Sequence, residues 1–299
     1  MFFIYTVLGI SAAFLLSHSL FAPALALSHK IKALDMPNQR KIHTQVIARG
    51  GGFMFFAPFV ILVLIMPLES SFKIGLAIGG TVTFLVGFWD DAISLSPFQK
   101  LAGQSLGAAV YILIRGSSGI LSGIALFCWL VFLENAINLC DGLDGLASGI
   151  SASQSVCLFA ISIFFRNFDA LVCLTLLLGV ILGFLPRNFP NAKIFMGDCG
   201  ALFLGFVLGA LSAELILGGP WAILVLSAYL IFRIPIADAT FSFFRRAVRR
   251  KNPFAADQGH FHHRLLAWGF TKECATLALI TATLFFGLLG VLLVWASTG

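Results

Sequence analysis

Long apolar stretches alternate with short polar segments along almost the whole chain. Most of these stretches run for about 15 to 22 residues, and roughly 20 apolar residues are enough for a helix to cross a membrane. The pattern predicts ten spanning helices, at about residues 2–25, 50–67, 73–89, 101–115, 119–134, 150–165, 169–185, 199–217, 221–238 and 275–296. We therefore expect an all-α, polytopic membrane helix bundle that forms a single domain over residues 1–299.

Composition agrees with this pattern. Hydrophobic residues make up 59% of the chain and charged residues 11%, and the mean hydropathy is +0.99. These values exclude the soluble globular classes and leave little polar sequence for a separate soluble domain.

The basic residues are distributed unequally between the two sets of predicted loops. One set, at residues 26–49, 90–100, 135–149, 186–198 and 239–274, contains fifteen of the nineteen Lys and Arg residues. The opposite loops contain only Lys73, Arg115 and Arg166, while Arg233 falls inside a predicted span. Basic loops stay in the cytoplasm, so this asymmetry predicts that both termini lie outside. Membrane topology thus explains the net charge of +6 without a nucleic-acid partner.

Five aspartates lie at the ends of apolar segments on the predicted cytoplasmic side. A carboxylate at a membrane boundary is costly and marks a functional site. Their shared side predicts an active site on the cytoplasmic loops, built for a metal ion and a phosphorylated ligand. The five are Asp90, Asp91, Asp141, Asp144 and Asp198.

Two of these acids are adjacent, in the sequence Phe88-Trp-Asp-Asp91. Neighbouring carboxylates raise each other's pKa unless a cation such as Lys100 offsets them. The pair therefore indicates metal binding, proton transfer or phosphate chemistry, with a solvated helix cap as the alternative.

The segment from Asn135 to Leu146 contains Asn138, Asp141 and Asp144 together with two glycines. Its carboxylate and amide oxygens suit Mg²⁺, and the spacing does not fit a calcium-binding loop. A helical turn would place both aspartates on one face. Asp198 opens a later helix, where capping of that helix is the alternative role.

Two further segments supply cations. Arg49 precedes three glycines that open a helix, and backbone N–H groups at such a terminus suit an anion, although an ordinary basic loop would also explain the charge. His260, His262 and His263 precede Arg264. With no cysteine nearby, this group fits diphosphate better than zinc, and a solvated loop is the alternative.

In this order, these stretches resemble the polyprenyl-phosphate N-acetylhexosamine-1-phosphate transferases, glycosyltransferase family 4, over residues 35–264. The resemblance implies that Asp198 binds Mg²⁺, with Mn²⁺ as a substitute, and that Asp90, Asp91 and His260 are catalytic. It also implies a set of substrate-binding residues, in which Phe195 stacks on uracil. That set is Lys41, Asn138, Asp141, Asp144, Phe195, His262, His263 and Arg264.

The resemblance implies attack by undecaprenyl phosphate on the β-phosphorus of a UDP-N-acetylhexosamine, which yields UMP and the first lipid-linked intermediate of a cell-surface polysaccharide. It places the protein in the bacterial cytoplasmic (inner) membrane and leaves a homodimer open.

The spacing of the three histidines favours an N-acetylglucosamine donor over the phospho-N-acetylmuramoyl-pentapeptide alternative, and Gln258 stands where relatives have a basic residue. A transporter is the competing class, but it predicts charges near the middle of the membrane.

Overall fold

The computed structural model describes residues 2–36, 45–248 and 259–298. Within these residues the chain forms thirteen helices and one two-stranded sheet. The first helices and the two strands are α1 (Phe2–Ser19), α2 (Phe21–Lys30), β1 (Leu34–Asp35), β2 (Ile47–Ala48), α3 (Phe53–Ile65), α4 (Ser70–Ile93) and α5 (Pro97–Arg115). The remaining helices are α6 (Ile120–Cys140), α7 (Leu146–Phe164), α8 (Phe168–Asn188), α9 (Gly197–Leu217), α10 (Trp221–Ile231), α11 (Arg233–Val248), α12 (Phe261–Ala267) and α13 (Lys272–Thr298).

Each of the ten predicted apolar segments lies on a helix or on a pair of consecutive helices. Among the described residues, seven helices are long and apolar enough to span a membrane, and the pair α10–α11 makes an eighth if it is one bent span. Two predicted spans fall short: α3 has only 13 residues, and α5, which begins at Pro97, carries the polar Gln99 and Lys100 in its first turn. The all-α membrane bundle is confirmed, whereas the count of ten spans is not.

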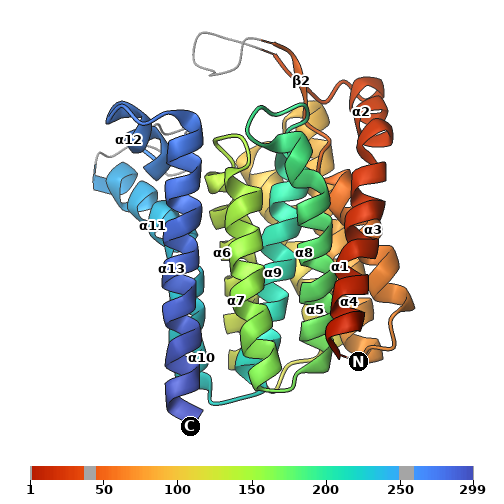
Figure 1. Cartoon of the computed structure of the whole chain (residues 1–299), viewed down its shortest axis with the longest axis vertical. Helices are drawn as coiled ribbons and strands as arrows, with labels where there is room; N and C mark the ends of the chain where they lie inside the picture. Colours follow the sequence, from red (N-terminus) through yellow and green to blue (C-terminus); the bar gives the residue numbers. More distant parts are fainter. Residues whose placement is uncertain (1, 37–44, 249–258, 299) are drawn as a thin grey trace.

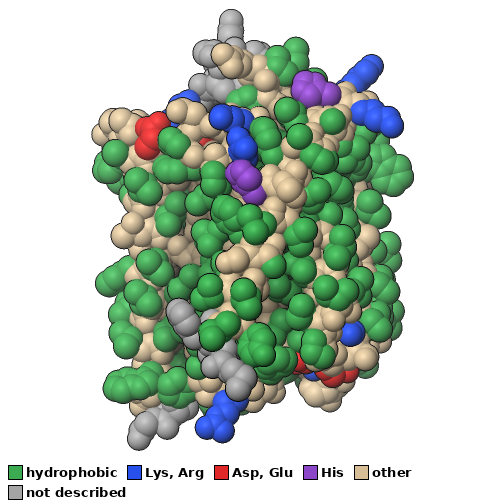
Figure 2. All heavy atoms as spheres, turned by 45° about the vertical axis from the view of Figure 1, so that its right-hand side comes forward, with side chains coloured by type: hydrophobic (Ala, Val, Ile, Leu, Met, Phe, Trp, Pro, Cys, Tyr) green, Lys and Arg blue, Asp and Glu red, His purple; other side chains and the backbone are tan. Residues whose placement is uncertain are grey.

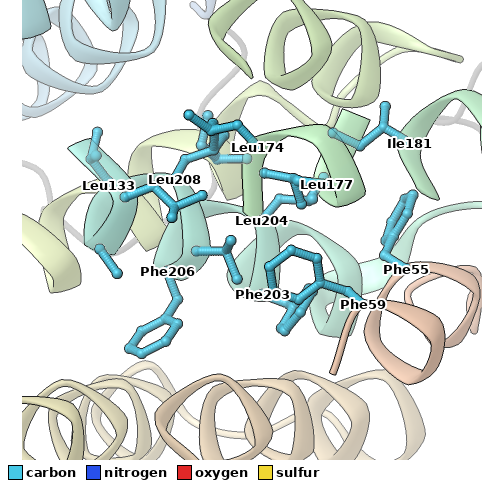
Figure 3. Packing of buried hydrophobic residues seen from close by; sticks show 14 of the residues in the cluster. Phe55, Phe59, Leu133, Leu174, Leu177, Ile181, Phe203, Leu204, Phe206 and Leu208 are labelled. Atoms are coloured by element: carbon cyan, nitrogen blue, oxygen red, sulfur yellow. The ribbon is translucent and has the colours of Figure 1, made fainter. Parts of the chain in front are cut away.

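Helix α9 occupies the centre of the bundle, where it packs against α3, α4, α6, α7, α8 and α10. Phe203 and Leu204 project from it toward side chains of α3 and α8, whereas Phe206 points the other way, toward Tyr111 of α5 (Figure 3). These side chains are completely buried, and in a membrane bundle their close packing, rather than removal from water, holds the helices together. Because α9 is held on all sides, its first turn is a fixed platform for the site.

Pro235, inside the apolar segment 221–238, predicts a bend in that span, and the structure confirms it. Helices α10 and α11 meet at an angle of 74°, and the break falls at Phe232. Proline lacks the N–H group that would continue the hydrogen-bond ladder, so the chain turns there and restarts as α11. Arg233 lies over the ring of Phe286, 4.6 Å from its centroid, rather than beside a carboxylate of the described chain.

The two ends of the bundle differ. The strands, α12 and the connections that carry the predicted site lie at one end, while α1 begins and α13 ends at the other (Figure 1). Between the ends, apolar side chains cover most of the visible surface (Figure 2). This apolar belt is the surface expected to face lipid.

Candidate active site

The paired acids Asp90 and Asp91 lie in the last turn of α4, beside the first turn of α9. Asp91 is buried, and its two carboxylate oxygens accept hydrogen bonds from the backbone N–H groups of Asp198 and Cys199, each at 3.0 Å. The first N–H groups of a helix have no partner inside the helix, so a carboxylate there satisfies them and interacts favourably with the helix dipole. Asp91 therefore fastens α4 to α9.

Asp90 contacts the ammonium group of Lys100. Its Oδ2 lies 3.2 Å from Nζ of Lys100 on α5, and its Oδ1 accepts a hydrogen bond of 2.6 Å from the N–H of Leu95. Nζ of Lys100 also contacts Oδ2 of Asp198 and lies 3.4 Å from Oδ1 of Asn138. Asn138 in turn donates a hydrogen bond of 3.0 Å to Oδ1 of Asp198. Three helices thus present oxygen atoms to one ammonium group.

A second cation, Arg49, reaches the same acids from the segment that follows β2. Its Nε lies 3.5 Å from Oδ1 of Asp91, and its Nη2 lies 3.7 Å from Oδ1 of Asp198. One third of the Arg49 side chain, 33%, remains exposed. The guanidinium therefore keeps donors that face outward, where an anionic ligand would arrive.

The cluster contains more negative than positive charge. Its members are Asp90, Asp91, Asp141, Asp198, Arg49 and Lys100. Four carboxylates against two cations leave four minus two, a surplus of two negative charges when all are ionised. Burial, together with the charge of Asp198, raises the pKa of Asp141 to about 7. Such a surplus suits the arrival of a further cation.

Gly197 makes the close approach of these segments possible. Its φ of +72° lies in the left-handed region, which glycine adopts without the steric cost that other residues incur. A Cβ atom at this position would overlap the carbonyl oxygen of Arg49 and come within 2.5 Å of Oδ2 of Asp91. The glycine before Asp198 is therefore required by the packing around the acids.

The glycine run after Arg49 does not form the predicted anion site. The N–H of Gly50 donates to Oγ of Ser28, while those of Gly51 and Gly52 donate to the carbonyl oxygens of Phe195 and Met196. Because these N–H groups are already hydrogen-bonded to other parts of the chain, they are not available to an anion. The prediction of an anion site at the glycine run was therefore wrong. The run instead holds Arg49 next to Asp198.

The segment that contains Asp141 and Asp144 is a turn between α6 and α7, because α6 ends at Cys140. Oδ2 of Asp144 accepts a hydrogen bond of 3.0 Å from the N–H of Ala192. The buried Asn188 accepts a bond of 2.9 Å from the N–H of Gly145 and donates one of 3.0 Å to the carbonyl oxygen of Ile194. These bonds join the turn to the segment that leads into α9.

The histidine motif is held by the bent helix. Oδ2 of Asp238 on α11 lies 2.8 Å from Nδ1 of His260, and Oδ1 accepts a bond of 2.7 Å from the N–H of Phe261. The ring of His262 stacks parallel to that of His260, 5.7 Å between centroids, and lies so close to Gly142 that no side chain would fit there. Burial lowers the pKa of His262 to about 4, so this imidazole is neutral at physiological pH.

The remaining predicted site residues lie outside the acidic cluster or outside the described part of the chain. His263 is adjacent to His262, with 4.3 Å between ring centroids. Phe195 is partly exposed and pairs through its backbone N–H with the carbonyl oxygen of Ala48. Arg264 is exposed, and its side chain forms no hydrogen bond or ion pair with other described residues. Lys41 lies outside the described residues, so its role stays a prediction.

Asn188 and Asp238 were absent from the predicted set, whereas Arg49 and Lys100 were named as cations near the acids but were not included among the site residues. A lysine in the first turn of an apolar helix, and an arginine directly before three glycines, are signals that the sequence does carry. No local pattern distinguishes Asn188, because a single amide at the end of an apolar helix has many possible roles.

A membrane helix bundle that gathers carboxylates, an amide and two cations at one end is built to act on a phosphorylated substrate. The chain belongs to glycosyl transferase family 4, whose family model matches residues 73–216. The resemblance stated from the sequence is confirmed, and a transporter is not supported.

Several relatives align with most of the chain, including one from Bacillus subtilis and one from Thermotoga maritima. The probable undecaprenyl-phosphate N-acetylglucosaminyl 1-phosphate transferase of Bacillus subtilis is 32% identical over 90% of this chain and 80% of its own length. The undecaprenyl-phosphate alpha-N-acetylglucosaminyl 1-phosphate transferase of Thermotoga maritima is 34% identical over 87% of this chain and 82% of its own. The phospho-N-acetylmuramoyl-pentapeptide-transferase of Limosilactobacillus fermentum is 32% identical but covers only 63% of this chain and 64% of its own.

Proposed function

We propose that this protein transfers N-acetylglucosamine-1-phosphate from UDP-N-acetylglucosamine to undecaprenyl phosphate and releases UMP. The observation that carries the proposal is the cluster of acids around Lys100 and Arg49 at one end of a membrane bundle. The donor sugar follows from the relatives named for N-acetylglucosamine, which align with about nine tenths of the chain, against 63% for the muramoyl-pentapeptide relative.

In the reaction, an oxygen of the lipid phosphate forms a bond to the β-phosphorus of the donor, and the bond from that phosphorus to the UMP oxygen breaks. Arg49, with its outward donors, neutralises the diphosphate, and Lys100 stabilises charge on the transferred group. Asp90 is 15% exposed in its side chain against 1% for Asp91, so Asp90 is the acid placed to accept the remaining proton of the lipid phosphate.

The acids around Lys100 also fit Mg²⁺. In the part of the chain that the structure describes, no three acidic, histidine or cysteine side chains form a ready-made metal site. Mg²⁺, however, takes one or two carboxylates and completes its shell with water and phosphate oxygens. Asp198, Asp90 and Asn138 already direct oxygens at one cation, and the surplus negative charge favours another. Bound there, with Asp198 as its main ligand, Mg²⁺ would neutralise the diphosphate.

A radiochemical assay tests both the reaction and the metal. Membranes that contain the protein, supplied with undecaprenyl phosphate and UDP-N-acetylglucosamine labelled in the sugar, should form a labelled lipid and UMP. EDTA should abolish transfer, because the surplus charge of the cluster would then repel the diphosphate, and Mg²⁺ or Mn²⁺ should restore it. A labelled product from the muramoyl-pentapeptide donor alone would refute the donor, and full turnover in EDTA would refute the metal.

For the membrane topology we propose ten passes, with α3 and α5 as short spans inside the bundle, both termini outside and the site in the cytoplasm. The excess of Lys and Arg in the loops at the site end supports this orientation. It also places the protein in the bacterial cytoplasmic membrane, where a UDP-sugar is accessible.

Cysteine labelling tests this orientation. In a variant whose six native cysteines are replaced, Ser70→Cys and Ala267→Cys introduce single exposed thiols at opposite ends of the bundle. An impermeant maleimide should modify residue 70 in intact cells and residue 267 only after permeabilisation. Modification of residue 267 alone in intact cells would invert the proposed topology.

A further inference from the structure

A polar cavity lies at the end of the bundle opposite the acids. It has a volume of about 330 Å³, and its walls include Tyr111, Arg115, Ser118, Glu214 and Leu217. Arg115 ends α5 and Glu214 is in the last turn of α9, whereas the first turns of these same helices carry Lys100 and Asp198. Sixteen residues of helix separate Asp198 from Glu214, roughly 24 Å at 1.5 Å per residue, so the cavity is distinct from the candidate active site.

The cavity contains an unsatisfied donor. Tyr111 is 1% exposed, yet its hydroxyl makes no hydrogen bond with any residue that the structure describes. Tyr111 is on the cavity wall and its hydroxyl is not one of the fully enclosed polar atoms that lack a partner, so the hydroxyl reaches the cavity and can donate a hydrogen bond to a bound acceptor.

The charges around Tyr111 define the kind of ligand. Arg115 binds Glu214 through two hydrogen bonds, of 3.1 Å and 2.7 Å, and its Nη1 lies 3.8 Å from Oε2 of Glu69. Glu69 is not on the cavity wall but lies beside Arg115; counted with it, one cation and two carboxylates leave one minus two, a net charge of −1. A simple anion is therefore disfavoured, whereas a group with both a phosphate and an ammonium can satisfy Tyr111, Arg115 and the two acids.

The polar cavity continues into an apolar groove. The groove, about 390 Å³ in volume, runs between α6, α9 and α10 as far as Ile236 beyond the bend, and almost its whole wall is apolar. Leu126, Ala213 and Leu217 line both spaces, so they meet at a common neck. A polar cavity joined to an apolar groove matches a ligand with a charged head and a hydrocarbon tail.

We propose that this end of the bundle binds one phospholipid with a zwitterionic ethanolamine headgroup. Its phosphodiester accepts hydrogen bonds from Tyr111 and Arg115, its ammonium faces Glu214 and Glu69, and one acyl chain lies in the groove. The site is separate from the transferase reaction and does not depend on the proposed activity.

Native mass spectrometry of the delipidated full-length protein tests this site. Phosphatidylethanolamine and phosphatidylglycerol with identical acyl chains are titrated separately, and we expect the first to bind at least about fivefold more tightly. Tyr111→Phe, which removes only the hydroxyl, should weaken binding of phosphatidylethanolamine about tenfold. Tyr5→Phe is the matched control, because Tyr5 is exposed on α1 and lines neither space, and it should bind like the wild type.

Two further variants keep the test decisive. Glu214→Gln removes one negative charge and should shift the preference toward phosphatidylglycerol, an effect that loss of stability would not produce. Leu217→Trp fills the neck at an exposed position and should weaken both lipids while thermal stability is kept. Equal binding of the two lipids by the wild type, or wild-type binding by Tyr111→Phe, would overturn the proposal. Displacement of phosphatidylethanolamine by undecaprenyl phosphate would also overturn it, because the groove would then belong to the substrate.

Discussion

Asp198→Asn is expected to lower kcat by about 10²-fold to 10³-fold while the protein still folds. Asp198 contacts Lys100, Arg49 and Asn138, and it is the proposed ligand of Mg²⁺. Asparagine keeps the shape of the side chain but removes the charge that binds a metal. Lys100 would retain Asp90 as its counter-ion, so the fold should tolerate the change.

Steady-state kinetics with labelled UDP-N-acetylglucosamine, together with thermal unfolding in detergent, checks this result. Glu214→Gln is the control, because Glu214 lies at the far end of the same helix, and its kcat should stay within about tenfold of the wild type. If Asp198→Asn kept near-full turnover in a folded protein, Asp198 would not be the metal ligand.

The paired acids should respond differently from each other when each is replaced by asparagine. Asp91→Asn is expected to lower the unfolding temperature by about 5 °C or more, since an amide can accept only one of the two N–H bonds and turns its own NH₂ toward the other donor. Asp90→Asn should leave the unfolding temperature near that of the wild type and lower kcat by about 10²-fold or more.

Thermal unfolding and kcat measured on the same preparations separate the two roles. Gly197 and the N-terminus of α9 are unchanged in both variants, so a difference between them reports on the acid alone. A stable Asp91→Asn protein that had lost turnover, beside an active Asp90→Asn protein, would exchange the roles of the two residues.

Much of the fold could be predicted from sequence patterns that extend over only a few neighbouring residues. An apolar run that forms a helix and faces lipid is visible as composition, which is why every predicted span coincides with a helix and why Pro235 located the bend. The polar exceptions were equally visible, because a carboxylate at a membrane boundary stands out against 59% hydrophobic residues. The spans at α3 and α5 could not be predicted reliably. Neighbouring helices can hold a short helix, or one with polar residues at its end, that is not long and apolar enough to span a membrane by itself.

The sequence by itself determined the membrane bundle, the bend and the aspartates at one end, because each depends on residues close together in the chain. Only the tertiary structure decided which charged groups lie in contact with one another. Asp91 and Asp198 are 107 positions apart, and the direct contact between them gives Asp91 a different set of partners from Asp90. The same packing made the glycine run a backbone junction and brought Arg49 next to Asp91 and Asp198. Such contacts depend on how helices that are distant in the sequence pack against one another. Local sequence patterns do not specify that packing.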